Sequence, residues 1–141
     1  MIRDGTLQDW PEVDRMARAF RDSAMTWAAY DPKVFRRVYQ GLSQDRNGLA
    51  LVLDLDGAKG VLLAAALPSP FSGELAAQEI MWWIDPSARG GSDGARMLDA
   101  YELWTRDVGA AHAGVTCLDE RVARLFDRRG YQRAEILYRV H

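Results

Sequence analysis

A glycine-rich stretch in the second half of the chain has the residue types of a phosphate-binding turn. The apolar run Ile80–Ile84 is followed by Asp85-Pro86 and by Arg89-Gly90-Gly91-Ser92-Asp93-Gly94, which leads into an amphipathic helix. The first N–H groups of a helix lack internal partners, and the helix dipole adds positive charge there. Glycines let this backbone curve around an anion, and Arg89 adds a cation with forked donors. The stretch predicts an anion site, with a plain flexible loop as the alternative.

Neither common nucleotide-binding signature explains this turn. The stretch contains no GxGxxG pattern of a dinucleotide-binding fold, and no Gly-Lys-Ser/Thr of a P-loop. The sequence therefore points to a phosphate cradle of another type.

Glu79 is the best candidate for a general base. It lies in the predicted central strand, beside the apolar run, and burial there would raise the pKa of its carboxyl. A carboxylate with a raised pKa is suited to general acid–base chemistry. The alternative is a Glu at the exposed start of a strand, making a surface ion pair. Glu74, on the neighbouring loop, is a weaker candidate.

Other residues with reactive side chains have simpler interpretations. His112 is expected to be a solvated loop histidine, and His141 has no second ligand at metal-site spacing, so no metal site is predicted. The single cysteine, Cys117, lies in an apolar-rich run and is expected to be a buried, inert thiol. Of Trp82 and Trp83, alternation places one in the core, and the other is a candidate wall of a ligand pocket.

The elements that must position these residues can be read from the apolar spacing. We expect, in chain order, a short strand at Ile2–Arg3, a helix over Asp9–Met25, a second helix that opens at Asp31-Pro32 and ends in the polar cluster Ser43–Gly48, strands at Leu49–Leu55 and Gly60–Leu67, a central strand at Ala76–Asp85, a helix over Gly94–Val108, a strand at Ala113–Leu118, a helix over Glu120–Arg129 and a last strand at Glu135–Val140.

Composition sets the broad class. The chain has 141 residues, 48% of them hydrophobic, and a formal net charge of −2, so one core-bearing domain over residues 1–141 is expected. The balanced charge gives no case for nucleic acid or an acidic membrane as partner. No apolar run reaches the roughly 18 residues of a membrane span. The sequence is thus typical of a soluble, cytoplasmic protein.

Two motifs resemble those of the GNAT N-acetyltransferases. The family's acetyl-CoA signature, Arg/Gln-x-x-Gly-x-Gly/Ala at a helix start, corresponds to Arg89–Gly94, with Asp85-Pro86 before it. The stretch Ala123–Tyr131 is similar to the Ala-x-x-Leu-Tyr-x-x-x-Gly-Phe signature that ends the last helix. The order of the expected elements also matches the family, so the resemblance covers the whole chain in outline and about 30 residues in motif detail.

This resemblance implies a fold, a co-substrate and a site. The fold is α/β (α+β), with a mixed, mostly antiparallel central sheet that splays between its fourth and fifth strands, flanked by about four helices. Acetyl-CoA would enter the gap, and an amine acceptor would approach from the side of the N-terminal helices and the Pro68–Gly73 loop. The implied binding residues are Trp82, Ile84, Arg89, Gly90, Gly91, Ser92, Asp93, Gly94 and Ala95.

Two residues depart from the family pattern. Ser92 replaces the central glycine of the signature, and its Cβ is expected to crowd the phosphate or restrict the backbone. Phe126 replaces the tyrosine that often protonates the leaving thiolate, and phenylalanine has no proton to give. Tyr131, Tyr138 or water would have to take that role, with Tyr131 as the candidate catalytic acid beside Glu79.

Two functions from different classes follow. The leading one is an acyl-CoA-dependent N-acyltransferase that moves acetyl from acetyl-CoA directly to a primary amine. The other is a catalytically inactive GNAT-like domain that serves as a structural or partner-binding component, for example of a virion, in line with a phage-like chain. Ser92 and Phe126 favour this second interpretation. A homodimer or a larger protein assembly stays open in both cases.

Overall fold

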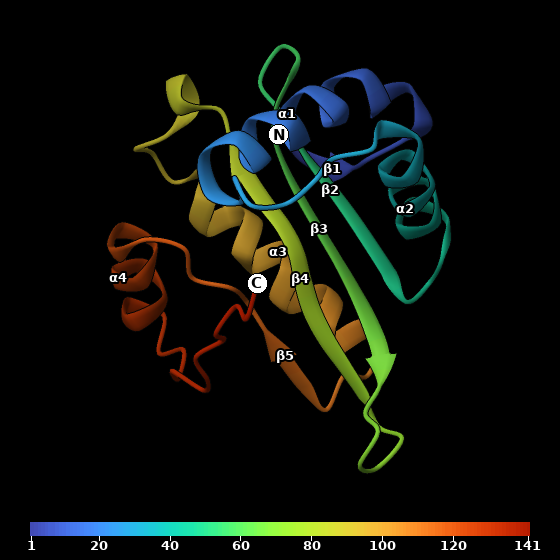
Figure 1. The fold of residues 1–141 in the computed structure, drawn as a ribbon, viewed down its shortest axis with the longest axis vertical. Helices are drawn as coiled ribbons and strands as arrows, with labels where there is room; N and C mark the ends of the chain where they lie inside the picture. Colours follow the sequence, from blue (N-terminus) through green and yellow to red (C-terminus); the bar gives the residue numbers. More distant parts are fainter.

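The computed structural model describes all 141 residues as a five-stranded sheet with helices on both faces (Figure 1). The elements are β1 Ile2–Asp4, a 3₁₀ turn Leu7–Asp9, α1 Trp10–Ala24, α2 Pro32–Gln44, β2 Gly48–Asp54, β3 Ala58–Pro68, β4 Leu75–Ile84, a 3₁₀ turn Pro86–Ala88, α3 Asp93–Asp107, β5 His112–Gly114 and α4 Glu120–Arg128. The predicted mixed, mostly antiparallel sheet with about four helices is confirmed.

The sheet has the spatial order β1-β2-β3-β4-β5, so neighbours in the chain are neighbours in the sheet. The first four strands are antiparallel, and β5 runs parallel to β4 because α3 connects them as a crossover. Strand β2 is buried on both faces, which explains its apolar sequence without alternation.

Each face of the sheet has its own hydrophobic core. Helices α1 and α2 cover one face, where Val13, Met16 and Tyr39 pack on Val61 and Met81. Helices α3 and α4 cover the other face, and Figure 1 shows α3 running behind the sheet. The second core includes Leu51, Leu53, Leu62, Met97, Leu98, Tyr101 and Phe126. Strand alternation decides which core a side chain joins.

Strands β4 and β5 separate after a short contact, as the predicted splay requires. Only Ala76–Gln78 pair with β5, at His112–Gly114, whereas β4 continues to Ile84. A β-bulge lies at Ile80, because Leu63 pairs with Met81 while the next residue of β3 pairs with Glu79. Beyond this point one edge of β4 has no neighbouring strand.

Strand β5 is shorter than the sequence indicates. The prediction extended it to Leu118, but it ends at Gly114. The N–H of Thr116, which a longer parallel ladder would bond to the β4 backbone, instead donates to Glu79 Oε1 at 2.9 Å. The Glu79 carboxylate therefore replaces the backbone acceptor that a longer ladder would provide. The residues that follow turn away from the sheet towards α4.

Two expectations are wrong. The last strand, predicted over Glu135–Val140, does not form: these residues have no regular structure and are exposed. A strand needs a neighbouring edge, and the three residues of β5 offer too short a template, so β-propensity alone does not order the segment. Cys117 is exposed rather than buried, because the chain has already left the sheet when it reaches this residue.

Candidate functional site

A cleft of about 640 Å³ lies where β4 and β5 separate. Its walls come from the upper half of β4, the glycine-rich turn with the start of α3, the segment after β5, helix α4 and the end of α1. In Figure 1 the turn and α4 lie on the same side of β4. Seven of the nine predicted binding residues line the cleft together: Trp82, Ile84, Arg89, Gly90, Gly91, Gly94 and Ala95.

The backbone of β4 presents donors to this cleft. The N–H of Asp85 donates to Lys59 O at 2.7 Å, so Asp85 points towards β3. Bonding direction alternates along an antiparallel strand, and the N–H groups of Trp82 and Ile84 therefore point away from β3. No strand lies on that side, since β5 pairs only up to Gln78. These two N–H groups therefore point outward, as they do along the unpaired edge of a sheet.

The glycine turn follows β4 through Asp85 and the 3₁₀ turn Pro86–Ala88. Gly90 has a φ of +98°, in the region that favours glycine. Gly94 lies on the first turn of α3, and a Cβ there would be 3.4 Å from the Trp82 ring. This is ordinary van der Waals contact, so the start of the helix lies directly over β4. The turn therefore brings the start of α3 to the open edge of the strand.

Ser92 does not distort this turn. It is the N-cap residue of α3, with φ −88° and ψ −3°, which any residue adopts. The carbonyl of Ser92 accepts the N–H of Arg96 at 3.0 Å. Ser92 and Asp93 begin the helix without being among the cleft-lining residues.

Arg89 is held at the mouth of the cleft by two contacts. Its Nε donates to Ile84 O at 2.7 Å, and its guanidinium lies 4.6 Å from the Trp83 ring centroid. The Nη groups of Arg89 make no hydrogen bond to the protein. The side chain is therefore oriented while keeping donors for an anion.

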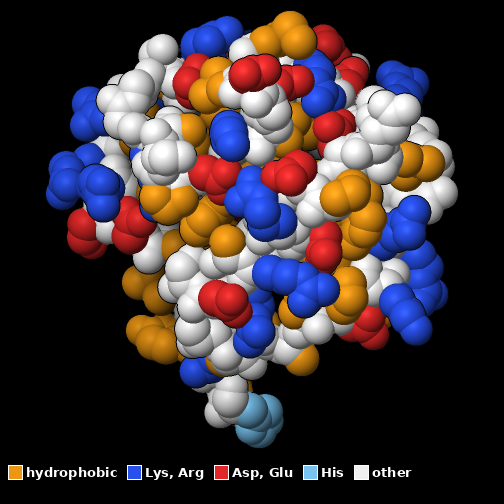
Figure 2. Space-filling view, turned by 90° about the horizontal axis from the view of Figure 1, so that it is seen from above, with side chains coloured by type: hydrophobic (Ala, Val, Ile, Leu, Met, Phe, Trp, Pro, Cys, Tyr) orange, Lys and Arg blue, Asp and Glu red, His pale blue; other side chains and the backbone are white.

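Three further cations from α4 line the cleft, and the sequence interpretation missed them. Arg121, Arg124 and Arg128 are spaced by three and four residues, so they share one face of the helix. None of the three forms an ion pair with a carboxylate. This spacing is visible in the sequence and could have predicted a basic face on the helix. Figure 2 shows acidic and basic side chains interspersed on the face seen from above.

Glu79 lines the cleft at the point where the strands separate. It is 7% exposed, which excludes the surface ion pair considered from the sequence. Burial raises the pKa of its carboxyl, and the hydrogen bond from the Thr116 N–H opposes this shift without cancelling it. Oε1 holds Thr116, which leaves Oε2 for another donor. A buried carboxylate with a raised pKa and one available oxygen is suited to accept a proton.

The two aromatic positions of the last-helix motif lie behind the cleft. Phe126 is buried between Trp82 and Tyr131, with ring-centroid distances of 6.2 Å and 5.4 Å. The Tyr131 hydroxyl accepts a hydrogen bond from Arg129 Nε at 3.2 Å, and burial raises the pKa of Tyr131. Tyr131 is not a cleft-lining residue, and Tyr138 is exposed on the C-terminal segment.

The other sequence candidates lie outside the cleft. His112 and Glu74 are exposed, on β5 and on the loop before β4. The Pro68–Gly73 loop joins the ends of β3 and β4 that face away from the turn, and it contributes no residue to the cleft. Of the two N-terminal helices, only α1 contributes to the cleft, with Phe20, Ser23 and Ala24 at its end.

A hydrogen-bonded network ties α1 to the beginning of the turn. Both Nη groups of Arg15 donate to the Asp85 carboxylate, at 2.8 and 3.1 Å, and the Trp83 indole donates to it at 2.9 Å. Burial acts to raise the pKa of Asp85, but the bonds from Arg15 and Trp83 outweigh it and lower that pKa. Asp85 thereby fixes the ring on which Arg89 stacks.

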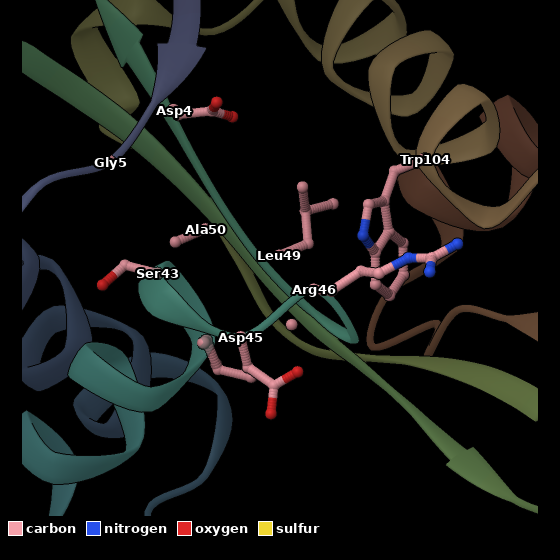
Figure 3. A pocket seen from close by; sticks show the side chains of 10 residues that line it. Asp4, Gly5, Ser43, Asp45, Arg46, Leu49, Ala50 and Trp104 are labelled. Carbon is pink, nitrogen blue, oxygen red and sulfur yellow. The ribbon is translucent and has the colours of Figure 1, made fainter. Parts of the chain in front are cut away.

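A second, smaller cavity of about 250 Å³ lies towards the β1 edge of the sheet (Figure 3). Asp4, Ser43, Asp45 and Arg46 line it, together with Trp104 of α3. None of the predicted site residues belongs to it. The candidate site is therefore the cleft beside β4.

The fold is that of known GNAT acetyltransferase structures. The chain is similar over its whole length to a tetramutant of the BH1408 protein from Bacillus halodurans (TM-score 0.80, 17% identity, 99% of that chain). It is similar to a ribosomal-protein-alanine N-acetyltransferase from Brucella melitensis biovar Abortus 2308 (0.72, 18%, 98%). It is also similar to an aminoglycoside acetyltransferase from an uncultured soil metagenomic sample, solved with sisomicin (0.70, 17%, 96%).

No family model and no curated protein sequence matches the chain. The structure brings together no group of three or more His, Cys, Asp or Glu side chains in a metal-binding arrangement. No helix combines the length and the apolar character needed to cross a membrane.

Proposed function

We propose that this protein is an acyl-CoA-dependent N-acyltransferase that transfers acetyl from acetyl-CoA to a primary amine. The observation that carries the proposal is the cleft itself. It joins two outward N–H groups of β4, the glycine turn at the start of α3, and four arginines within one cavity. These are the groups needed to hold an amide-bearing chain that ends in phosphates.

The proposal assigns the donor's phosphates to the turn. The N–H groups from Gly90 to Ala95, the dipole of α3 and Arg89 would hold the pyrophosphate. The arginines of α4 would neutralise the remaining negative charge. The N–H groups of Trp82 and Ile84 would bind the pantetheine amides and polarise the thioester carbonyl.

Glu79 is proposed as the general base. Its free Oε2 would take the proton of the attacking amine, directly or through a water molecule, so that the neutral amine attacks the thioester carbonyl. The new C–N bond forms, the C–S bond breaks, and the proton that the nitrogen loses as it becomes an amide passes to the leaving thiolate. Because the Tyr131 hydroxyl is bonded to Arg129 outside the cleft lining, the proposal gives this last protonation to water.

The inactive, partner-binding alternative is not favoured. A domain retained only as a structural component has no need of an open cleft at the splay or of outward donors on β4. Ser92 leaves the turn undistorted, so this departure from the motif no longer favours an inactive domain. Because the proposal gives protonation of the thiolate to water, a phenylalanine at position 126 does not prevent catalysis.

Isothermal titration with acetyl-CoA, and with CoA as a control, tests the proposal. We expect micromolar binding that Arg89→Ala weakens by about 10- to 100-fold, because an oriented guanidinium on a phosphate is lost. Arg46→Ala is the matched control, since Arg46 lines the other cavity (Figure 3) and should leave binding unchanged. No heat at millimolar acetyl-CoA would refute the acyltransferase proposal.

A further inference from the structure

The cleft has two chemically different ends. The end at the turn and α4 carries the four arginines, whereas the end at α1 is lined by Phe20, Ser23 and Ala24. Trp83 also lines the cleft, and the Arg89 guanidinium lies over its ring. We name the part bounded by these three α1 residues and Trp83 the acceptor end. Its lining has an aromatic and apolar character with a single hydroxyl.

The carboxylates around the acceptor end already have partners. Asp14 accepts from Tyr30 and Arg18, Glu12 accepts from Arg15, and Asp85 accepts from Arg15 and Trp83. Asp119 caps α4 by accepting the Val122 N–H. The cleft itself is lined by two carboxylates, Glu79 and Asp119, and each accepts one backbone N–H and keeps one oxygen free. Asp119 begins α4 and belongs to the end that carries the arginines, so Glu79 is the one cleft carboxylate outside that end, and its free oxygen leaves room for one ammonium group.

The charge of the cleft also disfavours an acceptor with several positive charges. Arg89, Arg121, Arg124 and Arg128 line it, against Glu79 and Asp119. A molecule with several ammonium groups needs several carboxylates to bind, and the acceptor end does not supply them. An amine with one charge and an apolar body fits both the wall and the free oxygen of Glu79.

The C-terminal segment lies beside this wall. It runs from α4 towards the connection between α1 and α2 (Figure 1), where the Arg139 guanidinium lies 5.0 Å from the Trp27 ring centroid. Trp27 follows α1 closely, so a second chain segment borders the region outside the acceptor end. This arrangement favours a small acceptor over a long polymer.

Resting on the proposed function, we infer that the acceptor is a small monoamine with an aromatic or otherwise apolar body. The amine would be oriented by Glu79 Oε2, and the body would pack on Phe20, Ala24 and Trp83. Polyamines and aminosugars with several ammonium groups are poor substrates in this assignment.

Steady-state acetylation of a small amine panel tests the inference. The probes are 2-phenylethylamine and tryptamine, against spermidine, kanamycin and a peptide with a free N-terminus, with CoA release followed by chromatography. We expect kcat/KM for the two arylalkylamines to exceed that for each other probe at least about 30-fold, from lost packing and unpaired charge. A preference for spermidine, kanamycin or the peptide would overturn the inference.

Two variants sharpen this test. Phe20→Ala should raise KM for 2-phenylethylamine about tenfold while leaving acetyl-CoA binding unchanged, because only the wall of the acceptor end is removed. Ser23→Asp should raise kcat/KM for spermidine roughly fivefold, since it adds a carboxylate at the acceptor end. Gln40→Asp adds the same charge on the exposed surface of α2 and should change nothing.

The outcomes separate the two proposals. If acetyl-CoA does not bind, the proposed function fails. If acetyl-CoA binds but neither arylalkylamine is acetylated, or Phe20→Ala leaves its KM unchanged, the proposed function stands and the monoamine inference fails.

Discussion

The two halves of β4 have the same neighbour on one side and different surroundings on the other. Over Leu75–Gln78 the strand lies between β3 and β5, whereas over Glu79–Ile84 it is paired with β3 alone. One half has its backbone groups engaged in the sheet, and the other presents them to a cleft. The difference arises from the departure of the neighbouring strand, since both halves belong to one continuous strand.

Glu79 lies at the boundary between these halves, and its role can be tested by removing its charge. Glu79→Gln keeps an oxygen that can accept the Thr116 N–H, but it cannot take up a proton. We expect kcat to fall by about 100- to 10,000-fold with unchanged acetyl-CoA affinity, as for loss of a general base. Stopped-flow or chromatographic kinetics with titration calorimetry measure both quantities. A normal kcat would make Glu79 a purely structural link between the strands.

Filling the space over the open half should abolish donor binding. In Gly94→Trp a large side chain would occupy the position where a Cβ already contacts the Trp82 ring. We expect acetyl-CoA affinity to fall by at least about 100-fold, because the indole displaces the bound chain from the cleft. Gly41→Trp is the matched control, since a Cβ on that helix meets nothing within 4 Å. Equal affinities in the two variants would place the donor elsewhere.

The arginine face of α4 should contribute a smaller, additive amount. Replacing Arg121, Arg124 or Arg128 by Ala should weaken acetyl-CoA binding about three- to tenfold each, and less at high salt, where exposed charges are screened. Arg133→Ala serves as the control, because that exposed side chain is paired with Asp127 and lies outside the cleft. Salt-independent affinity in the wild type would argue against an electrostatic role for α4.

The smallest expected effect is on stability. Burial gives Glu79 a higher pKa in the folded chain than in the unfolded chain, so the folded state binds more protons between the two values. The free energy of unfolding that Glu79 contributes therefore falls as the pH rises through that window. Thermal unfolding of the wild type and Glu79→Gln should show the wild type losing stability relative to the variant with rising pH. The opposite trend would show that the Thr116 bond outweighs burial.

The elements with strong local patterns were predictable. The amphipathic stripe of α1, the Asp-Pro start of α2 and the apolar runs of β2 to β4 gave boundaries within a few residues. The glycine turn was also readable, because the positive φ of Gly90 favours glycine. In these cases the physical cause lies in neighbouring residues of the chain.

Features that depend on distant partners were not predictable. Glu135–Val140 has strand-like composition, but a strand also needs an edge to pair with, and β5 ends after three residues. Cys117 is exposed because Glu79 captures the Thr116 N–H and the chain leaves the sheet. The α4 arginines gained their meaning only when the helix was placed across the cleft from β4.

The ion pair between Arg15 and Asp85 has a thermodynamic consequence. It joins α1, which bounds the acceptor end, to Asp85 at the beginning of the glycine turn, so a displacement of one wall of the cleft is coupled to the other. A ligand that immobilises one wall reduces the conformational entropy left for the other ligand to remove. Binding of the donor and of the acceptor should therefore be positively cooperative, and linkage makes the enhancement the same in either order of addition.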